Sequence, residues 1–210
     1  MCGKQPEVLW QKWKEKERKG KMRLSESEIK EIFVKSGALL EGHFRLTSGR
    51  HSNRYIQCAR VLMEPKYTEA LCSHLAESFR EEKVDLVIGP AMGGIVISYE
   101  MARQLGVPSL FTERVEGKMT LRRNFAIEPG QRVLVVEDVV TTGGSVLEVV
   151  DIVREAGGEV AGIALLVDRT GGKIDLGARL EACLSMNVES WEADACPLCK
   201  DGVPVVKPGS

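Results

Sequence analysis

The sequence predicts an α/β fold with a central, mainly parallel sheet flanked by helices. Residues 133–136 are four consecutive apolar residues, the pattern of a strand that is covered on both faces of a parallel sheet. A Gly-rich turn and a helical stretch follow this strand, and residues 84–106 repeat the order of strand, turn and helix. The chain has 210 residues, 43% of them hydrophobic, which suits one domain with a sizeable core.

The charge balance restricts the partners of this chain. It has 29 basic and 30 acidic residues and a net charge of -1, which argues against a broad surface for nucleic acid or membrane. No apolar run reaches membrane-spanning length, and the N-terminus lacks the apolar core of a signal peptide. We therefore expect a cytoplasmic protein whose six cysteines are mostly reduced thiols.

The N-terminal part divides at about residue 22. Residues 1–21 combine many lysines with few apolar residues, so we expect a disordered extension, and residues 22–210 form a single domain. The pattern Ser25-x-x-Glu28 predicts a capping box for a helix over residues 29–40. Residues 65–82 predict an amphipathic helix with His74 on its outer surface.

Residues 137–145 carry the chemistry of the first strand-turn-helix unit. Glu137 and Asp138 come at the carboxyl end of the strand, where open α/β sheets bind ligands. The turn TTGGS at 141–145 offers glycine backbone, hydroxyl groups and a helix start, which together suit a phosphate. The two acids would repel a phosphate and are better suited to the hydroxyls of a sugar. An ordinary Gly-rich corner without a ligand is the alternative.

The stretch VLVVEDVVTTGGS at residues 133–145 resembles the phosphoribosyl pyrophosphate (PRPP) motif of the type I phosphoribosyltransferases. Over about residues 24–208 the chain resembles the orotate phosphoribosyltransferases of that family. The resemblance implies the type I fold with a small N-terminal hood, about residues 22–62, and Mg²⁺ carried by PRPP rather than by the protein. It implies that PRPP is bound by Arg114, Lys118, Glu137, Asp138, Val139, Val140, Thr141, Thr142, Gly143, Gly144, Ser145, Ala91 and Met92.

The chain matches the family pattern at one peptide bond and departs from it at two places. The bond Ala91–Met92 matches the strained, sometimes cis, peptide of the pyrophosphate loop. Members often carry Tyr-Lys where Met92 and Gly93 stand, so the backbone has to hold the anion here. In many members a Lys precedes the Ser-Gly-Arg turn of the hood, and Thr47 occupies that position. For Arg50 and His51 in this turn we keep two interpretations, an exposed turn and a contact with the base.

Residues 113–125 carry a local basic excess in an otherwise neutral chain, and the simplest interpretation is a solvated hairpin. The resemblance implies instead the mobile catalytic loop, with Arg114 and Lys118 as its cations. The implied catalytic residues are then Lys118, Asp138, Glu137 and Arg114. The family also implies a homodimer in which the loop 114–123 acts in the partner's site.

The end of the next strand, Asp168-Arg169, is expected at the same sheet edge as Glu137. Arg169 and Thr141 match positions that contact orotate, and a planar guanidinium suits a carboxylate. The implied reaction transfers ribose 5-phosphate from PRPP to orotate, giving orotidine 5'-monophosphate and pyrophosphate in pyrimidine biosynthesis. A purine-base phosphoribosyltransferase and a non-catalytic PRPP-sensing regulator are the alternatives.

The C-terminal tail contains Cys196-x-x-Cys199 without a second cysteine pair. Such a motif is half of a zinc knuckle, and Cys183 is a single further candidate ligand. We expect two reduced surface thiols rather than zinc, because a metal would need ligands from another chain.

Overall fold

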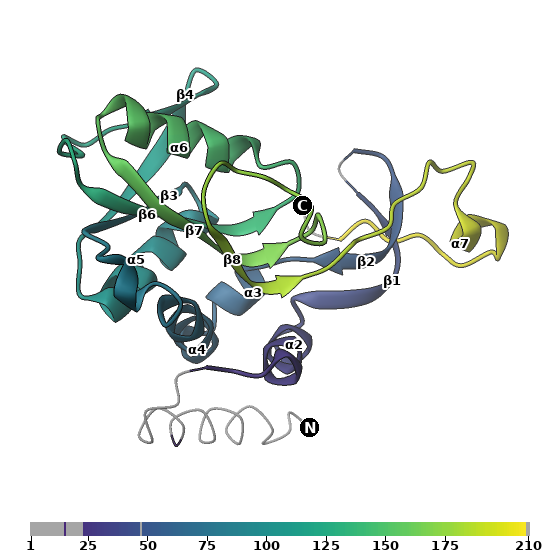
Figure 1. The fold of residues 1–210 in the computed structure, drawn as a ribbon. Helices are drawn as coiled ribbons and strands as arrows, with labels where there is room; N and C mark the ends of the chain where they lie inside the picture. The colour runs from purple at the N-terminus through teal and green to yellow at the C-terminus, as the bar shows by residue number, and fades with distance from the viewer. Residues whose placement is uncertain (1–14, 16–22, 47, 209–210) are drawn as a thin grey trace.

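The structure is a computed structural model, and it describes residues 15, 23–46 and 48–208. Its centre is a six-stranded sheet of order β5-β4-β3-β6-β7-β8, shown in Figure 1. All neighbouring strands are parallel except β4 and β5, which confirms the predicted α/β fold class. The strands are β3 (Leu86–Pro90), β4 (Ser109–Val115), β5 (Lys118–Leu121), β6 (Arg132–Val140), β7 (Glu159–Asp168) and β8 (Leu180–Ser185).

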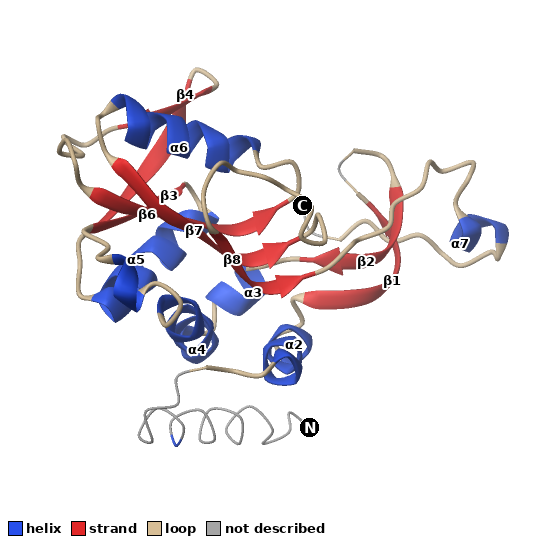
Figure 2. Cartoon of the chain, in the orientation of Figure 1, coloured by secondary structure: helices blue, strands red, loops and turns tan. Residues whose placement is uncertain are grey.

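Helices cover both faces of this sheet (Figure 2). On one face a large apolar core joins the sheet to α2 (Glu26–Lys35), α3 (Ala59–Leu62), α4 (Pro65–Ala76) and α5 (Gly93–Leu105). On the other face α6 (Gly144–Glu155) buries four valines against the sheet in a second core. A short 3-10 helix, η1, spans Arg80–Glu82. Within the described ranges, no helix has the length and apolar character needed to span a bilayer.

A separate two-stranded sheet forms the hood. Strands β1 (Leu39–Arg45) and β2 (His51–Ile56) pair antiparallel beside the main sheet, as Figure 1 shows. The C-terminal tail runs back along this hairpin and carries the short helix α7 (Pro197–Lys200). Isolated bridges join Phe44 to Val206 and His51 to Trp191, so the tail pairs with both hood strands.

The predicted capping box is confirmed, but the predicted helix over residues 29–40 is too long. The Ser25 side chain accepts from the Glu28 N–H, and the Glu28 carboxylate accepts from the Ser25 N–H at 2.8 Å. The helix ends at Lys35, because Gly37 takes a positive φ of 69° and turns the chain into β1.

The prediction that His74 lies on an outer surface is wrong. Its Nδ1 accepts a hydrogen bond of 3.0 Å from the Leu24 N–H, which ties α4 to the segment that leads into α2. Burial, followed by the nearby charge of Arg23, lowers the pKa of His74. Residues 1–21 apart from Glu15, and Thr47, lie outside the described part of the chain, so the expectations for them stay predictions.

Candidate active site

The acid pair lies on β6 where this strand loses one of its neighbours. β6 pairs with β3 only over Val133–Val135 but pairs with β7 as far as Val140. The strand is therefore longer than the predicted residues 133–136, and Glu137 and Asp138 lie inside it rather than after it. They occupy the part of β6 that β3 no longer covers, at the carboxyl edge of the sheet, where Glu137 lines a hollow and Asp138 lies against Gly93.

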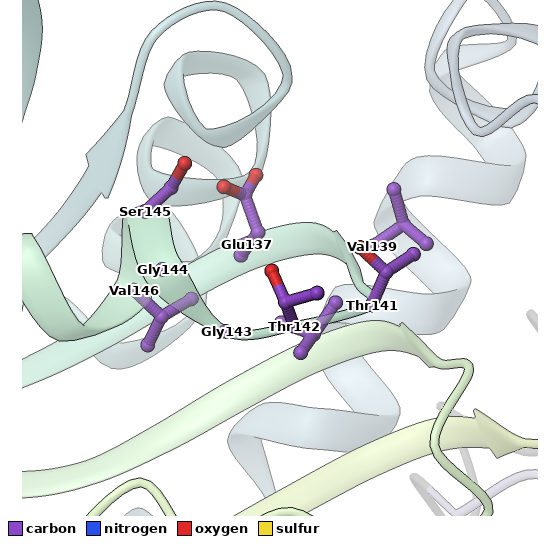
Figure 3. A pocket seen from close by; sticks show the side chains of 9 residues that line it. Glu137, Val139, Thr141, Thr142, Gly143, Gly144, Ser145 and Val146 are labelled. Carbon is purple, nitrogen blue, oxygen red and sulfur yellow. The ribbon is translucent and has the colours of Figure 1, made fainter. Parts of the chain in front are cut away.

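A hollow at this edge is built by the turn between β6 and α6 (Figure 3). It is lined by Glu137, Val139, Val140, Thr141, Thr142, Gly143, Gly144, Ser145 and Val146, which brings the predicted PRPP stretch of β6 and its turn into one site. We call the part formed by residues 141–145 the phosphate cradle. The first N–H groups of α6 have no carbonyl partner within the helix, and with the positive end of the helix dipole they suit an anion.

Gly143 is required by the shape of the cradle. It is the N-cap of α6 with a φ of 80°, a conformation that residues with a side chain rarely adopt. A Cβ on it would lie 2.6 Å from the side chains of Ile174 and Leu176. The glycine therefore allows both the turn and the close packing of the 170–177 loop beneath it.

Burial shapes the chemistry of the acid pair. It raises the pKa of Glu137, and the neighbouring charge of Asp138 raises it further. Burial also raises the pKa of Asp138. The Glu137 carboxylate accepts from the Asp138 N–H at 2.9 Å, which leaves other lone pairs of the two acids for a ligand. A pair of this kind favours partners that donate hydrogen bonds, such as sugar hydroxyls.

The turn after β3 comes close to the same acids. The peptide bond Ala91–Met92 is cis, as the resemblance implied. The next residue, Gly93, lies against Asp138, because a Cβ at this position would be 2.4 Å from Oδ2. Met92 is 83% exposed and points away from the core. Gly93 thus lets the turn approach Asp138 more closely than a residue with a side chain could.

Arg169 follows β7 at the same edge, where its N–H donates to the Val140 carbonyl at 2.9 Å. Its side chain is half-buried, and its buried Nε has no hydrogen-bond partner among the residues described. Burial lowers the pKa of Arg169, while Tyr55 and Cys58 act in the opposite direction, so the guanidinium lies near the hood. A buried donor without a partner is costly, which favours a ligand that supplies an acceptor.

Asp168 holds the loop that presents Arg169. Its carboxylate accepts from the Thr170 N–H and hydroxyl, the Gly172 N–H and the Ser185 hydroxyl, at 2.7 to 3.0 Å. Burial alone would raise the pKa of Asp168, but these hydrogen bonds outweigh it and lower the pKa. Asp168 is therefore a positioning residue for the loop.

Sequence reasoning missed Cys58, which precedes α3. Its thiol lies 3.5 Å from the Asp138 carbonyl, and burial, with the charges of Asp138 and Glu137, raises its pKa. The charge of Arg169 acts on the pKa of Cys58 in the opposite direction. No motif marks this cysteine in the sequence, because only the fold brings α3 under β6.

β4 and β5 form an antiparallel hairpin that includes residues 113–121, as the simplest interpretation of this stretch predicted. Its turn, Glu116-Gly117, has positive φ at both residues. Arg114 donates to the Glu148 carboxylate of α6 at 2.7 Å. Lys118 is exposed and lines a groove with α6 residues, and this groove shares no residue with the phosphate cradle. Within this chain, the structure does not bring Arg114 and Lys118 into the cradle.

Two expectations for the hood and tail are wrong. His51 is neither in an exposed turn nor near a base site, because it is buried beside Cys196 and Cys199. The expectation that a metal would need ligands from another chain fails for the same reason. His43 and His51 of this chain lie with the two cysteines, and Cys196 is itself buried. Cys183 instead lies buried near the Leu71 carbonyl.

The turn residue Arg50 packs onto the tail. Its guanidinium donates to the Ser190 hydroxyl at 2.9 Å and pairs with Glu192. The Ser-Gly-Arg turn therefore anchors the C-terminal segment, and Arg50 does not face the cradle.

Comparison with known proteins agrees with this geometry. The family described as "Phosphoribosyl transferase domain" matches residues 64–195. A protein of Desulforamulus reducens named orotate phosphoribosyltransferase is 61% identical over 187 residues, which cover 89% of this chain and 98% of that protein.

Solved structures share the fold. The crystal structure of orotate phosphoribosyltransferase from Aeropyrum pernix is 30% identical and superposes with a TM-score of 0.63, covering 74% of this chain and 92% of that one. An adenine phosphoribosyltransferase from Thermoanaerobacter pseudethanolicus is 23% identical with a TM-score of 0.56, covering 63% and 88%. Since proteins named for different bases share this fold, the fold alone does not choose the base.

Proposed function

This chain belongs to the phosphoribosyltransferase family, and from that premise we propose that it is an orotate phosphoribosyltransferase. It transfers ribose 5-phosphate from PRPP to N1 of orotate, giving orotidine 5'-monophosphate and pyrophosphate in pyrimidine biosynthesis. The observation that carries the choice of base is Arg169, whose buried Nε has no hydrogen-bond partner in the part of the chain that the structure describes. A carboxylate accepts two parallel hydrogen bonds from a guanidinium, and orotate carries a carboxylate group.

We assign the binding of PRPP to three neighbouring segments. The phosphate cradle, residues 141–145, holds the 5'-phosphate with backbone N–H groups and hydroxyls. Glu137 and Asp138 accept hydrogen bonds from the ribose hydroxyls, and the turn at Ala91–Met92 faces the pyrophosphate with its backbone. Thr141, at the rim of the cradle, and Arg169 contact the orotate. The approach of Gly93 to Asp138 supports a shared site for ribose and pyrophosphate.

Mg²⁺ accompanies PRPP in this proposal. Oxygen donors suit this ion, and the carboxylates of Glu137 and Asp138 lie beside the site proposed for the pyrophosphate. When bound, the ion neutralises part of the pyrophosphate charge, which lowers the repulsion between the anion and the acid pair.

The reaction needs stabilisation of charge more than it needs a nucleophile. Breaking the bond at the anomeric carbon develops positive charge on the ribose and negative charge on the leaving pyrophosphate. Glu137 and Asp138 lie on the ribose side and favour the positive charge. Lys118 and Arg114 are the cations proposed for the leaving group.

The loop cations are proposed to act in a partner's site. The groove that contains Lys118 is separate from the phosphate cradle of the same chain, and Arg114 is paired with Glu148. A homodimer in which the hairpin 114–123 reaches across would supply the missing cations. The cytoplasmic location predicted from the sequence stays a prediction.

The two alternatives differ from this proposal in specific residues. The substrate of a purine-base phosphoribosyltransferase has no carboxylate that Arg169 could bind. A PRPP-sensing regulator has no need for the exposed cation Lys118. The test is formation of orotidine 5'-monophosphate, identified by mass spectrometry, from PRPP and orotate with Mg²⁺. Asp138→Asn is the inactive control, and absence of product with wild-type protein that binds PRPP would refute the proposal.

A further inference from the structure

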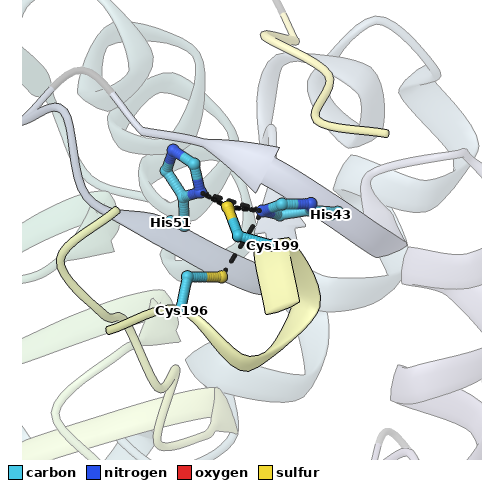
Figure 4. Close-up of side chains that lie close together, drawn as sticks. All are labelled: His43, His51, Cys196 and Cys199. Carbon is cyan, nitrogen blue, oxygen red and sulfur yellow. Dashed lines mark hydrogen bonds between the residues drawn. The ribbon is translucent and has the colours of Figure 1, made fainter. Parts of the chain in front are cut away.

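Four potential metal ligands converge where the C-terminal tail meets the hood. In the sequence they are distant from Glu137 and Asp138. They are His43 of β1, His51 of β2, and Cys196 and Cys199 of the tail, drawn in Figure 4. Their ligand atoms all lie within 4.8 Å of one another. We propose that these four side chains bind one zinc ion that fastens the C-terminal tail to the hood.

Three nitrogen–sulfur distances between the ligand atoms are close to those of a tetrahedral zinc site, and the distance between the two ring nitrogens is shorter. With Zn–S of about 2.3 Å and Zn–N of about 2.05 Å, tetrahedral geometry gives N···S separations of about 3.6 Å and an N···N separation of about 3.3 Å. The Cys196 sulfur lies 3.5 Å from His43 Nε2, and the Cys199 sulfur lies 3.7 Å from His43 Nε2 and 3.3 Å from His51 Nδ1. The two ring nitrogens are 2.9 Å apart. A small outward movement of the rings accommodates the ion.

The hydrogen bonds around His43 prepare it as a ligand. Its Nδ1 lies 2.7 Å from the Val203 carbonyl, an acceptor that requires the proton on Nδ1. Nε2 of a neutral ring then presents its lone pair to the centre of the cluster. Metal-binding histidines usually donate their other N–H in this way, which fixes the tautomer and the orientation of the ring.

The chemistry of the ligand set favours zinc. Two thiolates and two imidazoles in tetrahedral geometry are the Cys₂His₂ set of structural zinc sites. The set is closed, with four protein ligands and no position left for a substrate, so the ion has no direct part in the transfer reaction. His43, His51 and Cys196 are all buried, and without a metal their polar atoms would have little besides one another to satisfy them.

The backbone holds the ligands in register. The N–H and carbonyl of His51 pair with those of Trp191 at 2.8 Å, and the His43 carbonyl accepts from the Val206 N–H at 2.8 Å. The helix α7 that carries Cys199 therefore lies between two segments already paired with the hood. Binding of an ion there links the tail to both hood strands, across 148 positions in the case of His51 and Cys199.

The direct test measures metal in the full chain, produced without a histidine tag, loaded with zinc and then dialysed. We expect one zinc per chain, and X-ray absorption with two sulfur and two nitrogen neighbours at about 2.3 and 2.0–2.1 Å. Cobalt(II) in place of zinc should show thiolate charge-transfer and tetrahedral d–d absorption. Wild-type protein without stoichiometric zinc, or with a Cys196–Cys199 disulfide, would overturn the proposal.

Variants give a second readout that does not depend on catalysis. Cys199→Ser removes an exposed ligand and should lower zinc retention by at least tenfold, whereas Cys72→Ala, a buried cysteine outside the cluster, should keep one zinc per chain. A chelator should lower the melting temperature of the wild type and of Cys72→Ala but not that of Cys199→Ser. Equal zinc retention by Cys199→Ser and wild type would overturn the assignment. These results are independent of whether the chain uses orotate.

Discussion

Gly93 lies against the carboxylate of Asp138, so closely that a methyl group on Gly93 would be 2.4 Å from Oδ2. This contact joins the turn proposed for the pyrophosphate to the acid proposed for the ribose. The two segments come from different strand-turn-helix units, and only a glycine lets them approach so closely. The position where the resemblance implied a lysine is thus filled here by a packing glycine.

Gly93→Ala should displace Asp138 and lower kcat/KM. An error of about 1 Å in the placement of a catalytic group can cost on the order of 10²-fold, and we expect a loss of that size. Steady-state kinetics with PRPP and orotate measure it. Val96→Ala, an exposed position on the same helix, is the control and should retain activity. Wild-type kinetics in Gly93→Ala would show that the carboxylate tolerates the methyl group without functional displacement.

The acid pair should make stability depend on pH. Because the pKa of Glu137 is raised in the folded protein, the folded state binds the proton more tightly than the unfolded state, where the pKa is about 4.3. Its contribution is fully present below the unfolded pKa and is lost as pH rises through the folded pKa. Glu137→Gln removes this loss, so its melting temperature should exceed that of the wild type at pH 9 by more than at pH 5.

The size of this effect is measurable by calorimetry without substrates. Each 1 kcal/mol raises the melting temperature by about 2–4 °C in a domain of this length. The exposed Glu81→Gln is the matched control and should show no such pH-dependent difference. A constant difference between Glu137→Gln and wild type across this pH range would contradict the raised pKa.

Arg169→Ala should impair the use of orotate while PRPP binding stays nearly unchanged. Loss of one partner of a buried charged pair costs about 2–5 kcal/mol, which would appear in kcat/KM for orotate. Calorimetric titration with PRPP and Mg²⁺ separates the two ligands. Arg179→Ala, an exposed arginine far from the site, is the control. An equal loss of PRPP affinity would assign Arg169 to the phosphate or to the fold.

Lys118→Ala should lower kcat more than PRPP affinity, since the lysine charge matters most when the leaving pyrophosphate gains additional negative charge in the transition state. Loss of one such stabilising group typically costs about 10²–10³ in kcat. Mixing Lys118→Ala with Asp138→Asn tests the trans arrangement. Each hybrid dimer would have one site with both defects and one with neither, so activity should return towards half that of the wild type.

The mixture needs proof that subunits have exchanged, which native mass spectrometry provides. Hybrid dimers as inactive as both parents would show that Lys118 works in its own chain. A chain that stays monomeric at the concentration of the assay would contradict the dimer itself.

Local sequence was enough to predict the cradle and its acids. The run of valines before Glu137, and the glycines and hydroxyls after it, depend on neighbours within a few residues. The position of Arg169 also followed, because it lies at the end of a strand whose edge the fold class determines. The cis bond at Ala91–Met92 was implied only by the family resemblance.

Interactions distant in sequence could not be predicted in the same way. The pairing of His43 and His51 with Cys196 depends on the tail returning along the hood, and nothing local to any of the three residues signals that path. Similarly, Leu39 and Leu40 continue the apolar pattern of α2 but belong to β1. Gly37 turns the chain between the end of α2 and the start of β1.

The central claim, transfer of ribose 5-phosphate to orotate, is tested most directly by a panel of bases. The purified chain, PRPP and Mg²⁺ are incubated with orotate, uracil, adenine, hypoxanthine or guanine, and pyrophosphate release is followed. We expect rapid release with orotate, and with the other four bases only the background that Asp138→Asn also shows. Faster release with a purine than with orotate, or no release with any base from a chain that binds PRPP, would contradict the claim.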